Sequence, residues 1–562
     1  MKPHQALRIS SLIPTLAAGI VSNAFAADLY WDANGATSGT GNSGTTTSVN
    51  TWSNVNTWHS GSATGTLRSW VNGNTAVLGG TAGTITLSTT PAIGQIRFLT
   101  SGYSVGAAAA GPISFSGSYS DSVPTIDTSG GTLVSGKFDA TVSAKITGTP
   151  AGGVVIKDIN NITPPSTSGR VYLNNAANSD FTGDVTILSG NLHVLSNLGV
   201  PSNKIILKGG ALYGNAATTY TITRTVEVAA NSGIGTRGAA GTSIWDFTGP
   251  ITGSANLTRY GGTETSAVNV NLKGDMSGFS GTFENIGASN TGYVSIETTS
   301  TSAGAWKLTS GTVRLNTTSD THIANGTGKS DLVINGGTLD MNGKSETING
   351  LSGIGGVIQN QLAATVSTLT LGDGDATASY SGTIRDNGGT GGTVALTKTG
   401  GGVQTLGGTS TYTGDTLVSG GTLLVSGALG NTAVTVGTDA RIGGGGTLGG
   451  TLHFDAGAEF QFSTTQTLTV NGAAVTFGGF SIADIAGLDS TADNGTYTLI
   501  GGTALVSTTN LANVGFANAY DLGNGKAAFF EIGSLKVTVV PEPGAFLLGG
   551  LELMGFLRRR RA

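Results

Sequence analysis

Tyr412-Thr413-Gly414-Asp415-Thr416-Leu417-Val418-Ser419-Gly420-Gly421-Thr422-Leu423-Leu424-Val425-Ser426 is the stretch that decides the fold, because versions of it recur through most of the sequence. Each version has an aromatic residue, a small hydroxyl residue and a glycine, then a short apolar strand, a glycine turn and a second strand. One copy begins at Phe181, and its spacing to Leu192 equals the spacing from Tyr412 to Leu423 (192 − 181 = 423 − 412). Such equal spacing indicates one structural unit that is used repeatedly. We expect Tyr412 and Leu423 to be core residues and the glycines to form corners.

The composition also favours short strands with a glycine at nearly every corner. The 562 residues include 93 glycines and no cysteine, and 38% are hydrophobic while 10% are charged. A disordered low-complexity chain has a similar composition, but disorder would not preserve the alternation of apolar and polar residues seen in Val313-Arg314-Leu315-Asn316. The net charge of −5 provides no basic patch, so we expect no nucleic-acid partner. Without cysteine, disulfides, thiol catalysis and cysteine zinc sites are excluded.

Residues 1–26 have the pattern of a secretory signal peptide. A positively charged start is followed by an apolar segment and by Ala24-Phe25-Ala26, which has the small-x-small form of a cleavage site. We expect the Sec machinery to export the chain and the mature protein to begin at Ala27.

The mature chain is predicted to be all-β, a right-handed parallel β-helix (β-solenoid) with a cap at each end. Residues 27–104 hold four of the six tryptophans and are predicted to form an N-terminal aromatic β cap, although the rings are also suited to stacking on sugars. Residues 105–450 are predicted to form the repeat array, with roughly 20 to 30 residues per coil. Residues 451–539 are predicted to form a C-terminal β cap, and the sequence leaves open whether they form a separate domain.

The tail at 540–562 has three parts. Pro541-Glu542-Pro543 precedes an apolar segment at 544–557, and the tail ends in a basic cluster made of Arg558, Arg559, Arg560 and Arg561. Fourteen helical residues span only about 21 Å, which is short of the roughly 30 Å hydrocarbon core of a bilayer. This shortness favours a transient inner-membrane anchor that is cut near the Pro-Glu-Pro sequence, with the arginines on the cytoplasmic side.

The three-part tail resembles the PEP-CTERM sorting signal of Gram-negative bacteria. In this resemblance Pro541, Glu542 and Pro543 match the motif, and Arg558 to Arg561 match its basic end, while Glu552 departs from an all-apolar segment. The resemblance implies recognition by an exosortase, followed by processing and retention at the cell surface or in exopolysaccharide.

The body of the chain resembles proteins with the autotransporter-associated β-strand repeat. The residues that carry this resemblance are Leu396 to Gly401, Tyr412 to Thr416, Gly420 to Leu423, Gly336 to Gly343, Leu351 to Gly356 and Tyr30 to Gly35. We see no terminal series of alternating strands like that of a membrane β-barrel, so we do not expect a self-translocating autotransporter.

Residues for chemistry are sparse in the sequence. Asp373 and Asp375 lie on the same side of an extended segment and are weak candidates for a calcium site or an acid/base pair. Asp184 and Asp415 occupy equivalent repeat positions, which favours a role in turns. The histidines, at 4, 59, 193, 322 and 453, have no metal-ligand spacing. We expect no cofactor, although stacking of coils can bring distant residues together.

These observations lead to a primary hypothesis and an alternative. The primary hypothesis is a secreted, non-catalytic protein of the cell surface or extracellular matrix, structural or adhesin-like, with exopolysaccharide as a candidate partner. The alternative is a β-helical carbohydrate-active enzyme, a polysaccharide lyase or glycosidase. A cleft with convergent acidic and basic side chains would favour the enzyme, whereas a smooth rod would favour the spacer.

Overall fold

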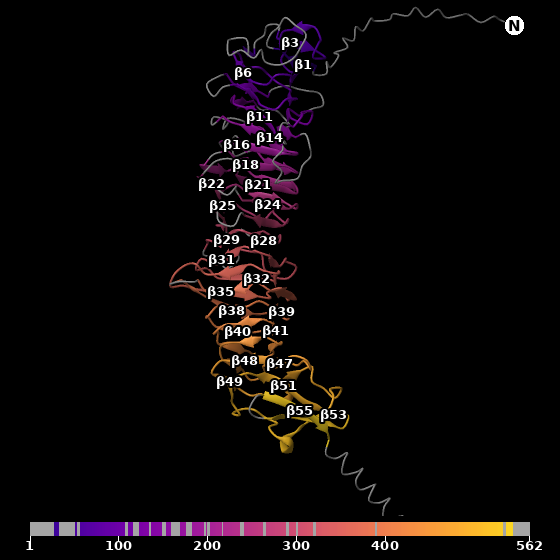
Figure 1. Ribbon diagram of the computed structural model, residues 1–562, viewed down its shortest axis with the longest axis vertical. Helices are drawn as coiled ribbons and strands as arrows, with labels where there is room; N and C mark the ends of the chain where they lie inside the picture. Colours follow the sequence, from indigo (N-terminus) through magenta and orange to yellow (C-terminus); the bar gives the residue numbers. More distant parts are fainter. Residues whose placement is uncertain are drawn as a thin grey trace, which may run out of the picture.

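A computed structural model gives the three-dimensional structure of the chain. The structure describes residues 27–32, 51–52, 57–106, 111–115, 123–133, 137–148, 153–158, 169–175, 182–195, 198, 203–215, 217–236, 241–261, 266–287, 292–298, 302–317, 322–387, 391–531 and 535–542. These residues form a long rod of stacked β coils that begins near β1 and ends near β53 and β55 (Figure 1).

The repeat unit quoted above makes two of the strands. β40 (Thr416–Val418) and β41 (Thr422–Val425) are separated by a turn at Gly421, whose φ of +59° is a conformation that residues with a Cβ rarely adopt. The two strands belong to different sheets, so the turn is a corner of the coil. The next strands, β42 (Ala428–Leu429) and β43 (Val434–Val436), complete the coil and bring the chain back beside β40.

One side of the rod, called face one, has two sheets in the described residues. The first is 11-stranded. Its strands are β4 (Leu67–Arg68), β3 (Trp58–Ser60), β1 (Asp28–Trp31), β5 (Thr75–Leu78), β7 (Gln95–Phe98), β10 (Thr125–Asp127), β13 (Val154–Lys157), β15 (Val185–Ile187), β17 (Ile205–Lys208), β20 (Val226–Ala230) and β23 (Ile251–Gly253). The second, 8-stranded, has β32 (Glu346–Ile348), β35 (Val366–Leu371), β38 (Thr393–Lys398), β40, β43, β46 (Leu452–Phe454), β49 (Ala474–Phe477) and β52 (Leu505–Val506).

Face two also has two sheets in the described part of the chain. The 13-stranded sheet has β2 (Thr51–Trp52), β6 (Thr84–Leu87), β8 (Tyr103–Val105), β11 (Phe138–Val142), β14 (Gly169–Leu173), β16 (Asn191–Val194), β18 (Ala211–Gly214), β21 (Ser232–Thr236), β24 (Leu257–Tyr260), β26 (Phe283–Ile286), β28 (Trp306–Ser310), β30 (Leu332–Ile334) and β33 (Leu351–Ser352). The 6-stranded sheet has β36 (Ala378–Tyr380), β39 (Val403–Leu406), β41, β44 (Arg441–Gly443), β47 (Glu459–Gln461) and β50 (Ile485–Ala486).

Face three begins later along the chain. Within the described ranges, its 8-stranded sheet has β19 (Thr219–Ile222), β22 (Gly241–Phe247), β25 (Ser266–Leu272), β27 (Tyr293–Ile296), β29 (Thr312–Leu315), β31 (Thr338–Asp340), β34 (Val357–Gln359) and β37 (Thr383–Ile384). Its 7-stranded sheet has β42, β45 (Thr447–Leu448), β48 (Leu468–Val470), β51 (Gly495–Gly501), β55 (Leu535–Pro541), β54 (Lys526–Glu531) and β53 (Tyr520–Gly523). A separate pair is formed by β9 (Ile113–Ser114) and β12 (Ile146–Thr147).

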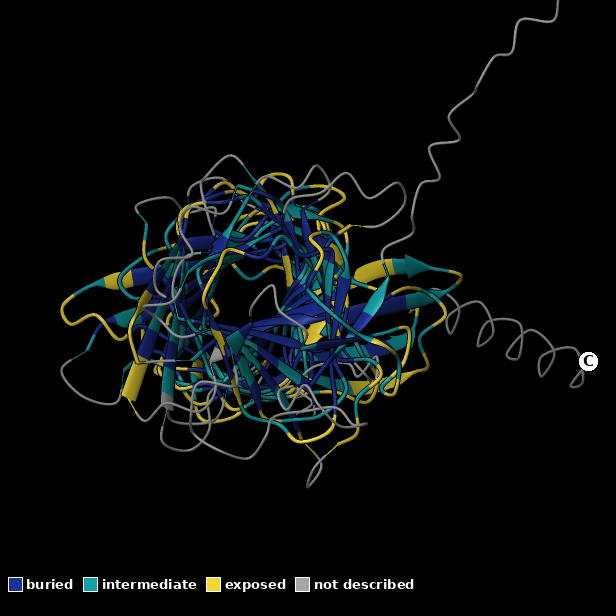
Figure 2. Cartoon of the chain, turned by 90° about the horizontal axis from the view of Figure 1, so that it is seen from above, coloured by how far each residue is buried: buried dark blue, intermediate teal, exposed yellow. Residues whose placement is uncertain are grey.

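The core lies inside the ring of strands. Seen along the rod, buried residues dominate the strands, and exposed residues gather at the corners and outer loops (Figure 2). In β38, for example, Val394, Leu396 and Lys398 are buried, and the residues between them are partly exposed, as expected for a period of two. Tyr412 and Leu423 are fully buried, which confirms the prediction that both are core residues.

Coil length varies along the rod. Thr416 pairs with Val434, 18 positions on (434 − 416), whereas Tyr103 pairs with Ala140, 37 positions on (140 − 103). The range is wider than the roughly 20 to 30 residues per coil expected from the sequence. The variation means that the neighbour of a residue in the next coil cannot be found by adding a constant number.

Each face passes from its first long sheet to its second at a different level. On face two the break is spanned by a single bridge between Gly353 and Tyr380. On face three the amide of Thr411 donates to the carbonyl of Ile384, beyond which β42 starts the next sheet. On face one the first sheet ends at β23 and the second starts at β32. The levels are therefore staggered along the rod.

The described sheets are parallel except at the two ends. Antiparallel pairs occur between β1 and β3 and between β3 and β4 near the start, and among β51, β53, β54 and β55 near the end. Parallel pairing extends beyond 105–450 in both directions, from β1 with β5 to β49 with β52. The helical segments among the described residues are the short 3-10 turns η2 (Ile482–Asp484) and η3 (Phe516–Asn518). The predicted all-β chain with long parallel sheets is confirmed.

Candidate binding surface

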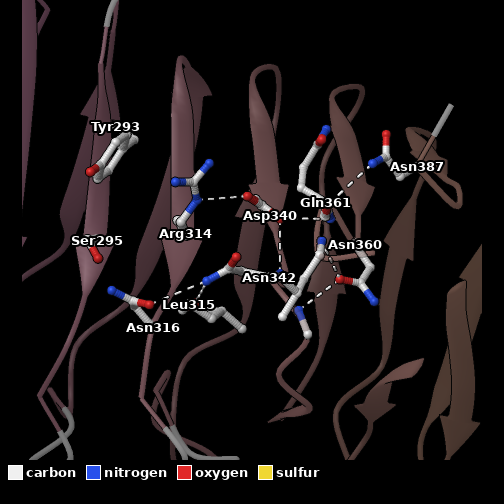
Figure 3. A network of polar contacts seen from close by, with 12 residues as sticks. Tyr293, Ser295, Arg314, Leu315, Asn316, Asp340, Asn342, Asn360, Gln361 and Asn387 are labelled. Carbon is white, nitrogen blue, oxygen red and sulfur yellow. Dashed lines mark hydrogen bonds and ion pairs between the residues drawn. The ribbon is translucent and has the colours of Figure 1, made fainter. Parts of the chain in front are cut away.

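A row of polar side chains crosses neighbouring strands on the outside of face three (Figure 3). Arg314 on β29 lies between two partners, because its Nε atom donates to Asp340 Oδ2 at 2.8 Å and its guanidinium lies 4.8 Å from the centre of the Tyr293 ring. Asp340 Oδ1 accepts the backbone N–H groups of Asn342 and Gln361 at 3.0 and 3.1 Å. The carboxylate therefore joins three successive coils.

The same row continues through the asparagines at the corner beside Asp340. Asn342 Nδ2 donates to the carbonyl oxygen of Leu315 at 3.0 Å, and Asn360 Oδ1 accepts the amide of Gly343 at 2.8 Å (Figure 3). Since these polar groups satisfy one another and the corner backbone, this row stabilises the rod and has little capacity left for a ligand.

The outside of face one is different, because it carries a column of threonines. The register of the paired strands places seven residues side by side, one per coil, and we call them the threonine column: Thr347, Thr370, Thr397, Leu417, Thr435, His453 and Thr476. All seven are partly or fully exposed. Successive members are separated by the strand spacing of about 4.8 Å.

Most hydroxyls of the threonine column are available to a ligand. Among the described residues, Thr347, Thr370, Thr397 and Thr435 have no side-chain hydrogen bond, whereas Thr476 Oγ1 lies 2.7 Å from His453 Nδ1. A hydroxyl can both donate and accept. The column contains no carboxylate, ammonium or guanidinium group. It is thus a regular and essentially uncharged array of donors and acceptors.

Three lysine or arginine side chains are buried among the described residues of the rod, and no sequence pattern indicated them. Lys398 Nζ donates to the carbonyl oxygens of Thr399, Gly400 and Gly420, and burial lowers the pKa of Lys398 to about 8. Burial also lowers the pKa values of Arg224 and Arg259 to about 10. Arg224 donates to the carbonyl oxygens of Gly183, Asn203 and Lys204, and Arg259 donates to Asn285 Oδ1 at 3.2 Å and to the carbonyl oxygen of Val268 at 2.5 Å.

The candidate acids from the sequence lie at turns. Asp373 and Asp375 are exposed, and Asp375 Oδ1 accepts the amide of Gly401 in the next coil at 2.5 Å. Asp184 Oδ1 accepts the amide of Lys204 at 2.7 Å, and the side chain of Asp415 is exposed. Phe181, at the start of the first repeat copy, lies outside the described residues. Within the described ranges, no group of three or more His, Cys, Asp or Glu residues has an arrangement that can hold a metal ion.

The structure brings together three residues that the sequence analysis did not connect. His322 Nδ1 lies 2.6 Å from Glu346 Oε2, and His322 Nε2 lies 2.9 Å from Thr317 Oγ1. The His322 and Glu346 side chains are fully buried, and burial raises the pKa of Glu346, against the opposing effect of its hydrogen bonds. The separation of 24 positions (346 − 322) lies within the range of coil lengths, which is the signal that relates the two in sequence.

The four tryptophans near the start form one cluster. Trp58 lies 5.2, 4.7 and 4.9 Å from Trp31, Trp52 and Trp70, measured between ring centres, and all four side chains are buried. Because the rings are buried against one another, they are not placed to stack on a sugar from solution.

The terminal signals lie mostly outside the described residues. The residues outside the described ranges are Ala24, Ala26, Pro543, segment 544–557 and the arginines at 558–561. Three residues of the terminal signals are described. The backbone amide of Ala27 donates to Asn74 Oδ1, and Pro541 is the last residue of β55. The backbone amide of Glu542 donates to the carbonyl oxygen of Gly525. Over the part of the chain that the structure describes, no helix has the length and apolar character needed to span a membrane.

The fold and its outer faces define a long rod of parallel β coils with polar sides.

Residues 396–425 match the family described as Passenger-associated-transport-repeat, which confirms the repeat resemblance for this segment. The chain is 29% identical over 278 residues to the "Adhesin BmaC autotransporter" of Brucella suis biovar 1 (strain 1330). This similarity covers 48% of the chain and only 7% of the length of that protein. No solved structure matches the chain.

Proposed function

We propose that this protein is a secreted, adhesin-like rod that holds a neutral polysaccharide on its threonine column. The repeat match and the similarity to an adhesin support a role at the cell surface. The threonine column supports the binding of a polysaccharide, because it is a regular polar array. Among the described residues, most of its hydroxyls have no protein partner. In this role the protein is a spacer and a binding surface rather than an enzyme.

A polysaccharide matches the column in geometry and in chemistry. Sugar rings in an extended chain follow one another at a spacing comparable to that of strands in a sheet, so a chain lying along the rod meets one threonine per coil. Each hydroxyl contact is weak, but several contacts on one polymer act at high effective concentration. The absence of charge in the column favours neutral over acidic polymers.

The test is a binding assay on the exported protein with two lysines placed in the column. The double variant Thr370→Lys/Thr397→Lys puts two long cations where the polymer lies. Thr405→Lys is a matched control, because Thr405 is also a partly exposed threonine in a central strand, β39 on face two. We expect the double variant to lose retention on immobilised neutral polysaccharide by about tenfold or more, since several weak contacts are lost together.

The outcomes of this assay test two statements separately: that the threonine column is the binding surface, and that the ligand is a neutral polymer. Equal retention of wild type, double variant and control on neutral polymers would place binding elsewhere and remove the column from the proposal. Retention of the wild type on acidic polymers alone would exclude a neutral ligand.

We also propose that the two ends of the chain direct export and sorting. The signal peptide at 1–26 would be removed before Ala27, and an exosortase would process the tail at Pro541-Glu542-Pro543 while 544–557 anchors it in the inner membrane of a Gram-negative bacterium. The mature protein would then reside at the cell surface or in the matrix. Mass spectrometry of surface protein should find residues 1–26 and 558–561 missing, and an intact C-terminus would contradict sorting.

We further propose that the coils are right-handed and that both ends are capped. The antiparallel strands and the tryptophan cluster would cover the first coil, and β53 to β55 would cover the last. Deleting 27–104 should expose a sheet edge and cause aggregation, which size-exclusion chromatography would detect. A monomeric, folded deletion variant would show that this end needs no cap.

A further inference from the structure

Thr317, His322 and Glu346 are connected in the order hydroxyl, imidazole, carboxylate. Glu346 opens β32, the first strand of the second sheet on face one. Its carboxylate accepts three hydrogen bonds, from His322 Nδ1 at 2.6 Å, from the His322 amide at 3.2 Å and from the Ile323 amide at 2.8 Å. Where the sheet of face one is interrupted, the Glu346 carboxylate thus accepts the backbone N–H groups of His322 and Ile323 in place of a neighbouring strand. It also holds the His322 ring in one orientation through Nδ1.

The hydrogen bonds also determine the tautomer of His322. The backbone N–H of Thr317 points at Nε2 at 3.2 Å, and an amide N–H can only donate, so Nε2 is an acceptor. The ring proton is therefore on Nδ1 and is donated to Glu346. Nε2 then has its lone pair directed at Thr317, whose Oγ1 lies 2.9 Å away.

This is the arrangement that activates a hydroxyl nucleophile. The base lies within hydrogen-bond reach of the hydroxyl, and a third group orients the base. Thr317 is partly exposed, whereas the side chains of His322 and Glu346 are fully buried, so the base is shielded from water. Among the described residues, the side chains that make hydrogen bonds with His322 are those of Thr317 and Glu346.

We propose that Thr317 is an acyl-acceptor site, at which an activated ester or thioester transfers its acyl group to the threonine hydroxyl. Thr317 Oγ1 forms a bond to the carbonyl carbon while its proton moves to His322 Nε2. The bond from that carbon to the leaving group breaks, and the leaving group takes the proton from Nε2. The products are a Thr317 ester and a free alcohol or thiol. Glu346 acts as a positioning residue.

The chain contains a built-in comparison. His453 Nδ1 lies 2.7 Å from Thr476 Oγ1, and its Nε2 lies 3.2 Å from Asp455 Oδ1, but the side chains of His453 and Asp455 are 41% and 47% exposed. Water competes for every contact there, and among the described residues no backbone amide donates to the His453 ring. We expect Thr476 to react much more slowly than Thr317.

The experiment treats the exported protein with p-nitrophenyl acetate and maps acetylation by peptide mass spectrometry. We expect one acetyl group on Thr317, released p-nitrophenolate in equal amount, and little label on Thr476. Thr317→Val and His322→Gln should reduce the rate at this site by about 100-fold or more, which is the range for removal of a nucleophile or general base. Thr317→Ser should retain labelling, and His453→Gln should leave labelling of Thr317 unchanged.

Glu346→Gln tests the positioning role. It should slow acetylation by about tenfold or more and move the half-maximal pH of the reaction downward, because the imidazolium that forms loses its anionic partner. An unchanged pH profile would overturn that role. Folded wild type that remains unlabelled at Thr317, or equal labelling of Thr317→Val protein, would overturn the site itself. Either result leaves polysaccharide binding untouched, since the threonine column lies on other residues.

Discussion

Lys398 Nζ lies 3.2 Å from the carbonyl oxygen of Gly420, a residue of the following coil. The same ammonium donates to the carbonyl oxygens of Thr399 at 2.6 Å and Gly400 at 3.0 Å. One cation therefore links the corners of two successive coils, and Gly420 belongs to the repeat unit at 412–426. Its side chain points inward from β38, beside Val394 and Leu396.

Lys398 should give the protein a measurable pH dependence of stability. Burial lowers its folded-state pKa to about 8 from an ordinary value of 10.5. Between these two pH values the unfolded chain binds more protons than the folded one, so this group makes the free energy of unfolding rise with pH. Relative to Lys398→Met, the wild type should gain stability between pH 8 and 10.5 in urea denaturation.

A matched control for this effect is Lys329→Met, because Lys329 is exposed. This variant should show the same pH dependence as the wild type over the same window. If Lys398→Met also follows the wild type at every pH, the ammonium is not protonated differently in the folded and unfolded states.

Leu423 should contribute far more stability than its near neighbour Leu417. Leu423 is fully buried, whereas Leu417 is 40% exposed on the outside of β40. Leu423→Ala should cost about 2–5 kcal/mol through lost burial and a cavity, and Leu417→Ala should stay within about 0.5 kcal/mol. Because repeat proteins can open locally, hydrogen exchange of residues 393–443 is the appropriate measurement. Equal effects of the two substitutions would contradict the assigned strand faces.

Gly421 should tolerate no side chain, whereas Gly437 should. At Gly421 φ is +59°, and an added Cβ would lie 2.4 Å from the carbonyl oxygens of Gly400 and Gly402. At Gly437 the nearest atom to an added Cβ, the Val418 carbonyl oxygen, would be at 3.4 Å. Gly421→Ala should cost more than about 1–2 kcal/mol, whereas Gly437→Ala should be neutral or slightly stabilising. Thermal unfolding of both variants checks this, and a neutral Gly421→Ala would show that the corner is not as tight as described.

Trp58 should be the most sensitive member of the tryptophan cluster, since it contacts the other three rings. Trp58→Ala should cost about 3–5 kcal/mol and increase proteolysis of the first coils, while distant coils remain protected. Limited proteolysis followed by mass spectrometry tests both statements. Uniform loss of protection along the whole rod would indicate that the coils unfold together.

The sequence was sufficient to predict the repeating part of the fold. The aromatic header and the glycine turn of the unit at 412–426 predicted buried Tyr412 and Leu423, and both are buried. Alternation in segments such as Val313 to Asn316 predicted strands, and β29 is one of them. These predictions succeeded because periodicity of two and turn glycines are local properties.

The side-chain contacts between coils could not be predicted from the sequence. Thr317, His322 and Glu346 meet only because one particular coil places His322 beside residue 346, and coil lengths differ widely, for example 18 and 37 residues (434 − 416 and 140 − 103). The inward direction of Lys398 was equally hidden, because a lysine in an alternating strand is expected to face water. The threonine column emerged only when the register of successive strands was known.

The staggered levels at which the three faces change sheets have a mechanical consequence. Between β33 and β36 the ladder of face two is reduced to one bridge, but face one and face three are continuous there through β32 with β35 and β34 with β37. Where face three is interrupted after β37, faces one and two are continuous through β38 with β40 and β39 with β41. At these levels, therefore, no single plane across the rod interrupts all three faces at once. A tensile load along the axis must therefore break the hydrogen bonds of unbroken ladders before the rod separates.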